Sequence, residues 1–586
     1  MSDQRLGHGL VPVASQLLPT TAVPRTRARC FRERYDPEVT RSRWVLSSAV
    51  VCLAGLLYVY HPIIWGGLGT VSADAFDGRI MITILEHWFN VFSFREAPLD
   101  PLYFHPFKNV LAYNDGLLIS GIFYSLFRAI GADPFLAYEF LNWTVRTIGC
   151  LATIAAARRV LGLTPSASLA AGFLLLVATN LALRMNHAQL LYAGFLPLGL
   201  LVFTATHAAL AGGSNVRAAG AIIGFALFIL SWALTAFYSL YTFCLFLAVY
   251  VGWLNIVSPA TRSETARIVR DRFRLVAFAA IALAGVGLSV LAVYSRALGV
   301  AHDVSTIRQL AGYPVDLMNI GAGNLIWSPI LARVYHSLTG EELVSSELST
   351  GFTPVLLVCF LAALAWLWHA RRSQTERFAQ HIAIALACLT LAMLSLKLGG
   401  RAAWEPIFRF VPGARAIRVP MRLLLFITPF IILIVMAGLE GGFGLRQRRW
   451  LGMAAVLIIA VEQYRVDLPF TLDRIAETAF LARVPTPPAT CRSFYVSVPR
   501  IDPTGNPALD QFYVGAVDAM LLAEMLRLPT INGMASFQPA GWDLQAPFDP
   551  TYQARVMRYA EAHRLNGLCA LDLKAFRWSA TEHGAH

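Results

Sequence analysis

The chain has 586 residues, and its composition excludes an ordinary soluble enzyme, a disordered chain and a coiled coil. Hydrophobic residues make up 56% of it and charged residues 14%, and its mean hydropathy is +0.56, whereas globular proteins carry roughly 25% charged residues. The formal net charge of +13 is divided among short arginine clusters between apolar segments, so it forms no basic face of the kind that binds nucleic acid. These numbers favour a polytopic membrane protein with no nucleic-acid partner.

Apolar segments organise most of the chain after a polar, arginine-rich stretch at 1–42, which we expect to be a cytoplasmic tail. Crossing a bilayer takes ~20 apolar residues, and twelve segments approach that length. The segment at 115–131 is short and contains Asp115 and Arg128, so we expect it not to cross. The twelve segments lie at about 43–65, 115–131, 135–157, 166–184, 189–211, 218–234, 238–258, 275–294, 351–369, 380–398, 420–439 and 450–466.

Arginine clusters predict the orientation, because cytoplasmic loops carry an excess of Lys and Arg. Clusters at 158–159, 262–274, 371–377 and 446–449 place these loops inside, together with the N-terminus. Twelve crossings cannot satisfy this pattern, but eleven can. We therefore predict an all-α polytopic protein of the plasma membrane with about eleven transmembrane helices, a cytoplasmic N-terminus and an extracytoplasmic C-terminus.

This topology divides the chain into a membrane domain at 43–466 and a small extracytoplasmic α/β region at 467–586. The predicted outer loops of the membrane domain are 66–114, 295–350 and 399–419. Cys491 and Cys569 lie in the only long non-apolar stretch. Because disulfides persist in oxidising compartments, we predict a bond between these two cysteines.

The first outer loop offers acidic residues directly after the first span. Asp74 and Asp77 lie near the membrane edge, and Glu86 and His87 follow one helical stretch later. Carboxylates at that depth cost free energy unless they are solvated or paired, which makes them candidates for a function. An aspartate here can serve as a general base. A helix cap with solvated loop charges fits the same pattern equally well.

The third outer loop is unusually basic for an outside segment. Its arginines face one acid, Glu405, and arginine binds phosphate with a planar, bidentate fork. We expect Arg415, Arg418 and Arg422 to bind the phosphate of a lipid at the membrane edge. A cytoplasmic position of this loop, or ordinary phospholipid anchoring, would also explain the charge. The five arginines are Arg401, Arg409, Arg415, Arg418 and Arg422.

Further polar residues are candidates to line the same outer cavity. His105, His187 and Tyr238 join Glu86 and His87 in this set. A structural histidine or an interfacial aromatic belt accounts for them as well. The Cys and His spacing matches no zinc site, so we predict no metal and no other cofactor.

Several segments together resemble the GT-C superfamily of polytopic glycosyltransferases, and within it a bacterial group. Downstream matches include IRVPMRLLLFITPFIILIVMAGLEGG, LPTINGMASFQPAGW and NGLCALDL. The resemblance implies a lipid-phosphate-linked sugar donor and an acidic catalytic residue in the first outer loop, which falls on Asp77, with Asp74 second. Gly78 and Arg79 depart from the usual apolar continuation and leave open whether Asp77 faces a cavity or pairs with Arg79. The upstream matches are FDGRIMITILEHW, FHPFKNVLAYNDGLLISGIFYSLF, FLAYEFLNWTVRTIGCLATIAAARRVLG, MNHAQLLYAGFLPLGLL and LTAFYSLYTF.

The resemblance implies a membrane glycosyltransferase of the bacterial inner membrane. It would move a sugar from a polyprenyl-phosphate-linked donor to a hydroxyl of an envelope glycan, lipid or protein on the extracytoplasmic side. Asp77 would take the proton, and Arg418 and Arg422 would stabilise the leaving phosphate. An envelope glycopolymer ligase or polymerase remains an alternative. A non-enzymatic transporter of a lipid-linked sugar is another, although we find no inverted repeat in the sequence.

Overall fold

The computed structural model describes residues 41–297, 302–442, 449–468 and 470–580. The predicted tail at 1–42 and the cluster at 446–449 lie almost entirely outside the described residues. Helices dominate the described part of the chain, and its strands form three small sheets. A mostly helical protein with a small sheet region is therefore confirmed.

Eight helical segments are long and apolar enough to cross a membrane, so the chain is a membrane protein. Four shorter apolar helices complete the set of twelve segments predicted from the sequence. They are α4 (Leu118–Ala129), the two arms Pro354–Ala370 and Phe378–Leu394 of α15 (Pro354–Leu394), and α18 (Arg449–Glu462). The eight long segments are α2 (Arg41–Trp65), α5 (Pro134–Arg159), α6 with α7 (Pro165–Val177 and Thr179–Ala182), η2 with α8 (Ala188–Gly194 and Phe195–Gly212), α9 (Asn215–Ala233), α10 (Phe237–Val257), α12 (Phe273–Val293) and α17 (Arg422–Gly441).

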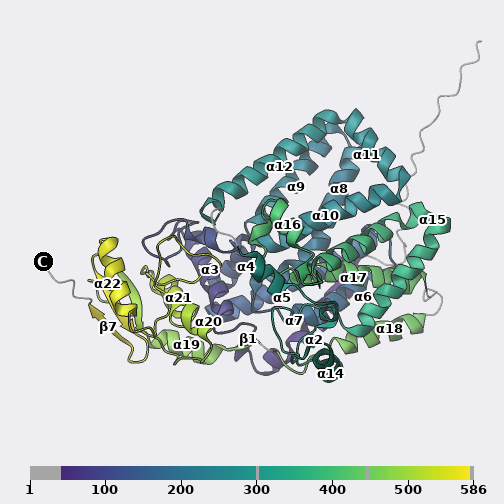
Figure 1. Ribbon diagram of the computed structural model, residues 1–586. Helices are drawn as coiled ribbons and strands as arrows, with labels where there is room; N and C mark the ends of the chain where they lie inside the picture. The colour runs from purple at the N-terminus through teal and green to yellow at the C-terminus, as the bar shows by residue number, and fades with distance from the viewer. Residues whose placement is uncertain (1–40, 298–301, 443–448, 469, 581–586) are drawn as a thin grey trace, which may run out of the picture. The chain divides into compact units, whose positions relative to one another are not determined.

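Two of these helices are equally apolar but differ in what surrounds them. In α17, 94% of the most apolar window is buried within the protein, whereas in α12 the figure is 0%. Figure 1 shows α17 among other helices and α12 at the margin of the helical bundle beside α9. Among the eight long segments in the described chain, α12 thus leaves the most apolar surface uncovered by protein, although one side of it packs against α9.

Helix α15 runs through two predicted spans that the sequence separates by the basic cluster at 371–377. The rings of Trp366 and Phe378 nevertheless lie 5.2 Å apart, whereas twelve residues of straight α-helix extend ~18 Å. The helix therefore folds back on itself between these residues, and its two arms serve as the two predicted segments.

The four segments that the sequence predicts to be outside contact one another at one end of the helices. The first loop and the C-terminal region share an antiparallel pair of strands. The second loop contacts the third loop through the backbone and the C-terminal region through a pair of aromatic rings. At the other end, Ser258 Oγ donates to Glu376 Oε2 at 2.6 Å and joins two of the basic loops. The outer contacts are β1 (Thr70–Val71) with β4 (Leu472–Asp473), His302 N to Arg415 O at 3.4 Å, and the rings of His302 and Phe537 at 5.2 Å.

The outer loops themselves contain short elements, and one short helix lies on the opposite side. The first loop holds α3, which positions the candidate site. The elements are α3 (Asp77–Phe92), η1 (Val110–Tyr113), α11 (Pro259–Asp271, in a basic loop), η3 (Ser295–Ala297), α13 (Val304–Leu310), η4 (Pro314–Met318), α14 (Ser328–Thr339), β2 (Lys397–Leu398), β3 (Arg401–Ala402), α16 (Glu405–Phe410) and η5 (Ala414–Ala416).

The C-terminal region combines helices with a three-stranded sheet of order β5-β6-β7, in which β5 and β6 are parallel and β6 and β7 antiparallel. The predicted disulfide between Cys491 and Cys569 is confirmed, with the Cα atoms 5.6 Å apart. Helix α21 packs against α3 of the first loop. The elements are α19 (Arg474–Arg483), β5 (Ser493–Val498), α20 (Pro507–Phe512), α21 (Ala516–Leu526), α22 (Tyr552–Ala562), β6 (Leu568–Asp572) and β7 (Arg577–Ala580).

Candidate active site

Asp77 is the first residue of α3, and Asp74 shapes the turn that precedes it. Asp74 Oδ1 accepts hydrogen bonds from the backbone N–H groups of Phe76 at 3.0 Å and Gly78 at 2.8 Å. Asp74 Oδ2 accepts from Asn186 Nδ2 at 2.6 Å, which attaches the turn to the segment after α7. Both carboxylate oxygens of Asp74 are thus engaged in holding the start of the helix, where a negative charge also interacts favourably with the helix dipole.

The carboxylate of Asp77 meets side chains from two other parts of the chain. Tyr513 of the C-terminal region donates its hydroxyl to Oδ1 at 3.2 Å, and His187 Nε2 lies 3.5 Å from Oδ2. The side chain of Asp77 is 36% exposed. Arg79 pairs instead with Glu477 and Asp518, so Asp77 faces the cluster around His187.

Arginines approach the same place and share one carboxylate from the second outer loop. Arg422 Nη2 donates to both oxygens of Glu347, at 2.9 and 2.8 Å, and Arg422 Nε donates to Oε2 at 3.2 Å. Arg418 Nη2 adds a bond to Oε1 at 3.1 Å. Arg184 Nη2 donates to the backbone carbonyls of Ser346 and Ser349, so three guanidinium groups surround the loop that carries Glu347.

The surroundings move the pKa values of the acids in opposite directions. Burial raises the pKa of Asp77, and the carboxylate of Glu347 acts in the same direction. Burial alone would raise the pKa of Glu347 too, but Arg422 and Arg184 hold that pKa well below its ordinary value. Burial, with Arg422 next, lowers the pKa of His187 to about 4. At neutral pH Glu347 is therefore ionised and His187 neutral, and Asp77 accepts a proton more readily than an ordinary aspartate does.

Tyr238, predicted to line the cavity, and Arg415, predicted to bind phosphate, differ in their placement. The Tyr238 hydroxyl donates to the backbone carbonyl of Val419, and Arg422 lies over its ring, 5.6 Å from the centroid. Arg415 is exposed in η5, and its carbonyl accepts from His302 N at 3.4 Å. The structure thus brings Tyr238 to the arginine cluster and shows no contact of Arg415 with Glu347 among the described residues.

Glu86 and His105, both predicted to line the cavity, have partners elsewhere. Glu86 is buried, forms a two-pronged pair with Arg128 at 2.9 and 3.0 Å, and accepts from the hydroxyl of Tyr124 at 2.7 Å. The carbonyl of His105 accepts from Tyr559 of the C-terminal region at 2.8 Å. These contacts join α3 to α4 and the first loop to α22, respectively.

Among the described residues, one group of side chains could hold a metal ion, and His87 is part of it. Its nitrogen and carboxylate oxygens of Glu96 and Glu524 lie within 4.8 Å of one another. His87 Nδ1 lies 2.7 Å from Glu96 Oε2, and Nε2 lies 3.2 Å from the carbonyl of Pro98. Burial, with Glu96 next, raises the pKa of Glu524. The contact of His87 with Glu96, and a Glu524 carboxyl that keeps its proton more readily, therefore account for this grouping.

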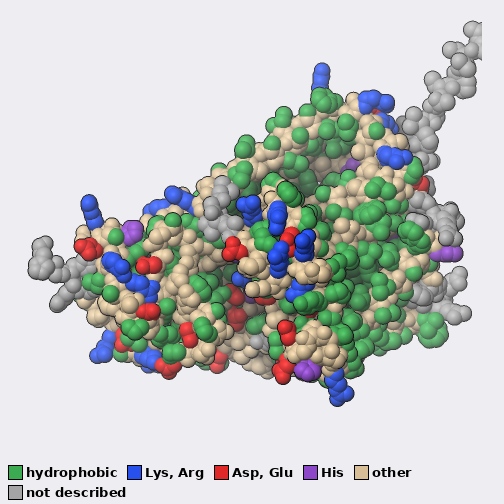
Figure 2. Space-filling view, in the orientation of Figure 1, with side chains coloured by type: hydrophobic (Ala, Val, Ile, Leu, Met, Phe, Trp, Pro, Cys, Tyr) green, Lys and Arg blue, Asp and Glu red, His purple; other side chains and the backbone are tan. Residues whose placement is uncertain are grey.

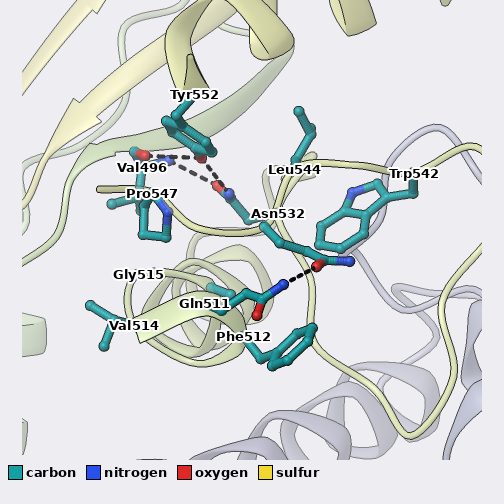
Figure 3. A pocket seen from close by; sticks show the side chains of 12 residues that line it. Val496, Gln511, Phe512, Val514, Gly515, Asn532, Trp542, Leu544, Pro547 and Tyr552 are labelled. Carbon is teal, nitrogen blue, oxygen red and sulfur yellow. Dashed lines mark hydrogen bonds between the residues drawn. The ribbon is translucent and has the colours of Figure 1, made fainter. Parts of the chain in front are cut away.

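A small pocket lies within the C-terminal region, on residues that flank Tyr513 in sequence (Figure 3). Its lining contains no charged side chain. Asn532 donates to Tyr552 at 2.8 Å and accepts from Val496 N at 2.9 Å, while Gln511 donates to Gln545 at 3.2 Å. Since these amides pair with protein groups, the pocket is a less suitable site for charged chemistry than the cluster around Asp77.

Figure 2 shows Lys and Arg side chains gathered over α16, next to a hollow that contains acidic side chains.

Three residues of the candidate site were not identified from the sequence: Arg184, Glu347 and Tyr513. Arg184 has a signal, because it is a charged residue at the end of an apolar run, three positions before His187. Glu347 and Tyr513 lie in segments with no distinguishing pattern, and only the fold brings them to the site.

No family model and no curated protein sequence matches the chain. Two solved structures of the Archaeoglobus fulgidus oligosaccharyltransferase resemble it. The apo form is 12% identical with a TM-score of 0.49, and the match covers 90% of this chain and 69% of the other. The complex with Zn and sulfate is 13% identical with a TM-score of 0.46, and the match covers 83% of this chain and 62% of the other.

Proposed function

We propose that the protein is a membrane glycosyltransferase of the GT-C type that uses a polyprenyl-phosphate-linked sugar and acts at the outer face of the bacterial inner membrane. The observation that carries this proposal is the placement of Asp77. Its partly exposed carboxylate lies beside His187 and close to arginines at the end of a transmembrane bundle. A proton acceptor beside cationic groups, at the edge of a membrane, is what transfer from a lipid phosphate requires.

In the proposed reaction the donor's tails lie in the bilayer, and its phosphate binds at Arg418 and Arg422. The acceptor hydroxyl donates a hydrogen bond to Asp77, which takes the proton as the oxygen attacks the anomeric carbon. The bond between that carbon and the phosphate oxygen breaks, and the lipid phosphate leaves with the electron pair. A positioned base contributes ~10²–10⁴-fold, and one well-placed donor to the developing charge ~3–4 kcal/mol.

The proposal includes eleven crossings, with the N-terminus in the cytoplasm and the C-terminal region outside. Contacts at both ends of α4 support its exclusion from the count. Leu117 N donates to the carbonyl of Thr235 at 3.0 Å, next to the site. Just beyond the other end, Asp133 pairs with Arg474 of the C-terminal region at 2.7 Å. A helix that begins and ends beside outer segments does not cross the membrane.

Purified protein incubated with a panel of polyprenyl-phosphate-linked monosaccharides tests the proposal. Asp77→Asn keeps the size of the side chain but cannot accept the proton at neutral pH, so we expect turnover to fall ~10²–10⁴-fold while donor binding persists. Asp502→Asn, at an 83% exposed side chain of the C-terminal region, serves as the matched control. Native turnover in Asp77→Asn, or no transfer from any donor by the unmodified protein, would contradict the proposal.

A further inference from the structure

The arginine cluster of the candidate site already holds an anion from the chain itself. Both oxygens of Glu347 accept from Arg422, and one also accepts from Arg418. A guanidinium binds carboxylate and phosphate with the same planar fork. The carboxylate of Glu347 therefore occupies the donor positions that two oxygens of a phosphate group would use.

A phosphate cannot bind favourably at these arginines while Glu347 stays paired with them. It would lie against the ionised Glu347 and close to Asp77, whose pKa already responds to Glu347, and like charges at such a distance repel. Among the described residues, Glu347 is the carboxylate that pairs with Arg418 and Arg422. Removing it from the fork frees both arginines at once.

Within this loop the backbone beside Glu347 is held by hydrogen bonds, whereas the Glu347 side chain can rotate. Arg184 bonds to the backbone carbonyls of Ser346 and Ser349 on either side of Glu347, so it fixes the loop and not the carboxylate. The side chain of Glu347 is 31% exposed, whereas that of Arg422 is 9% exposed. Rotation of the Glu347 side chain toward solvent would thus uncover a largely buried arginine without moving the loop backbone.

We propose that Glu347 is an internal competitor for the phosphate-binding site: it covers Arg418 and Arg422 in the resting protein, a phosphate group binds by displacing it, and its return to the arginines promotes release of the lipid phosphate. This inference rests on the proposed function and adds its regulation. It also makes Glu347 a specificity-determining residue, because a ligand must bind the arginine fork better than a carboxylate does. The competition keeps affinity for both donor and product moderate.

Equilibrium binding of farnesyl phosphate to the full-length protein in lipid nanodiscs tests the inference without any turnover. We expect Glu347→Gln to bind the probe at least ~10-fold more tightly than the unmodified protein, since the competing charge is gone. Glu347→Asp should show a smaller gain, because it keeps the charge but shortens the reach. Glu341→Gln, an exposed acid of the same loop, should bind as the unmodified protein does.

Inorganic phosphate is the second probe and separates the phosphate from the lipid tail. The gain in Glu347→Gln should appear with both probes, whereas the tail should raise the affinity of every variant for farnesyl phosphate. Unchanged or weaker binding in Glu347→Gln and Glu347→Asp would overturn the inference, as would a lack of binding in all variants. If Glu347→Gln does not fold, the Glu347→Asp comparison alone decides. A gain in binding without sugar transfer by the unmodified protein would contradict the proposed function and leave this inference intact.

Discussion

Asp77 and Arg79 lie two residues apart on α3, but their charged groups differ in exposure and in the side chains that they contact. Arg79 is 2% exposed and pairs with Glu477 and with Asp518, the latter at 3.1 Å. Asp77 is partly exposed, and within the described ranges its carboxylate contacts a tyrosine hydroxyl at 3.2 Å and a histidine at 3.5 Å. The charge of Arg79 is closed off by two acids in direct contact, whereas the arginines near Asp77 act on it from a distance while their own side chains pair with Glu347. One helix thus carries a fully paired charge and a charge without a direct ion-pair partner among the described arginines.

Arg79→Met should have the largest effect on stability and so test the structural side of this comparison. It leaves Glu477 and Asp518 buried with only Arg500, and breaking a buried pair costs ~3–5 kcal/mol. We expect a marked loss of thermal stability in detergent, measured by the unfolding transition of the purified protein. Arg577→Met, at an exposed position of β7, is the control. A transition as high as that of the control would show that this cluster does not hold the C-terminal region on α3.

Arg422→Lys should leave folding largely intact and lower turnover. The lysine keeps the charge beside Glu347 but cannot reproduce the fork, and hydrogen bonds to charged groups contribute ~1.5–3 kcal/mol. We expect turnover at saturating donor to fall ~10–100-fold. If Arg422→Lys instead matched the unmodified enzyme, the fork would not act on the leaving phosphate.

The pH dependence of turnover tests whether Asp77 acts as the base. Burial raises the pKa of Asp77 above its ordinary value of 3.8, and the ionised form is the base. Activity should therefore be full above that raised pKa and fall ~10-fold per pH unit below it. His187, with a pKa of about 4, stays neutral over most of this range. The measurement is a pH profile of kcat/KM, and an acidic limb centred at or below pH 3.8 would argue against Asp77 as the base.

Asp74→Asn should have the smallest effect. The asparagine keeps an acceptor for the N–H groups of Phe76 and Gly78 but loses the acceptor for Asn186 Nδ2. It also loses the charge at the start of α3, which is worth ~0.3–1 kcal/mol. We expect turnover within a few-fold of the unmodified enzyme and a slightly lower unfolding temperature. A loss as large as that of Asp77→Asn would reassign the base to Asp74.

The sequence predicts those features of the protein that depend on local composition. Apolar runs predict the twelve helices, and the cysteines of the non-apolar stretch predict the bond between Cys491 and Cys569. The position of Asp77 after the first span also makes it a candidate. The sequence cannot show which residues from distant segments come into contact. The pairing of Glu347 with Arg422, 75 residues away, and the contact of Tyr513 with Asp77 depend on how distant loops meet.

The sequence predicts that the chain turns back between the spans 351–369 and 380–398, but it does not predict that the chain stays helical through 371–377. A basic segment between apolar runs predicts a loop, and helix propensity does not distinguish a loop from a bent helix. The hydropathy of α12 and α17 is the same, at 2.5. Hydropathy therefore identifies a helix that can enter a membrane, but not whether protein or lipid surrounds it there.

The parallel pairing of β5 with β6 has a consequence for the order in which the protein is built. Parallel neighbours need a long connection, and here that connection carries α20, α21 and α22, with Tyr513 between the first two. The sheet cannot close until β6 has been synthesised, long after the membrane helices, since chains grow at ~5–20 residues per second. The connection also carries Tyr513, whose hydroxyl contacts Asp77 of the first outer loop. A ribosome that stopped before β6 would therefore leave the membrane bundle in place with the outer sheet unfinished.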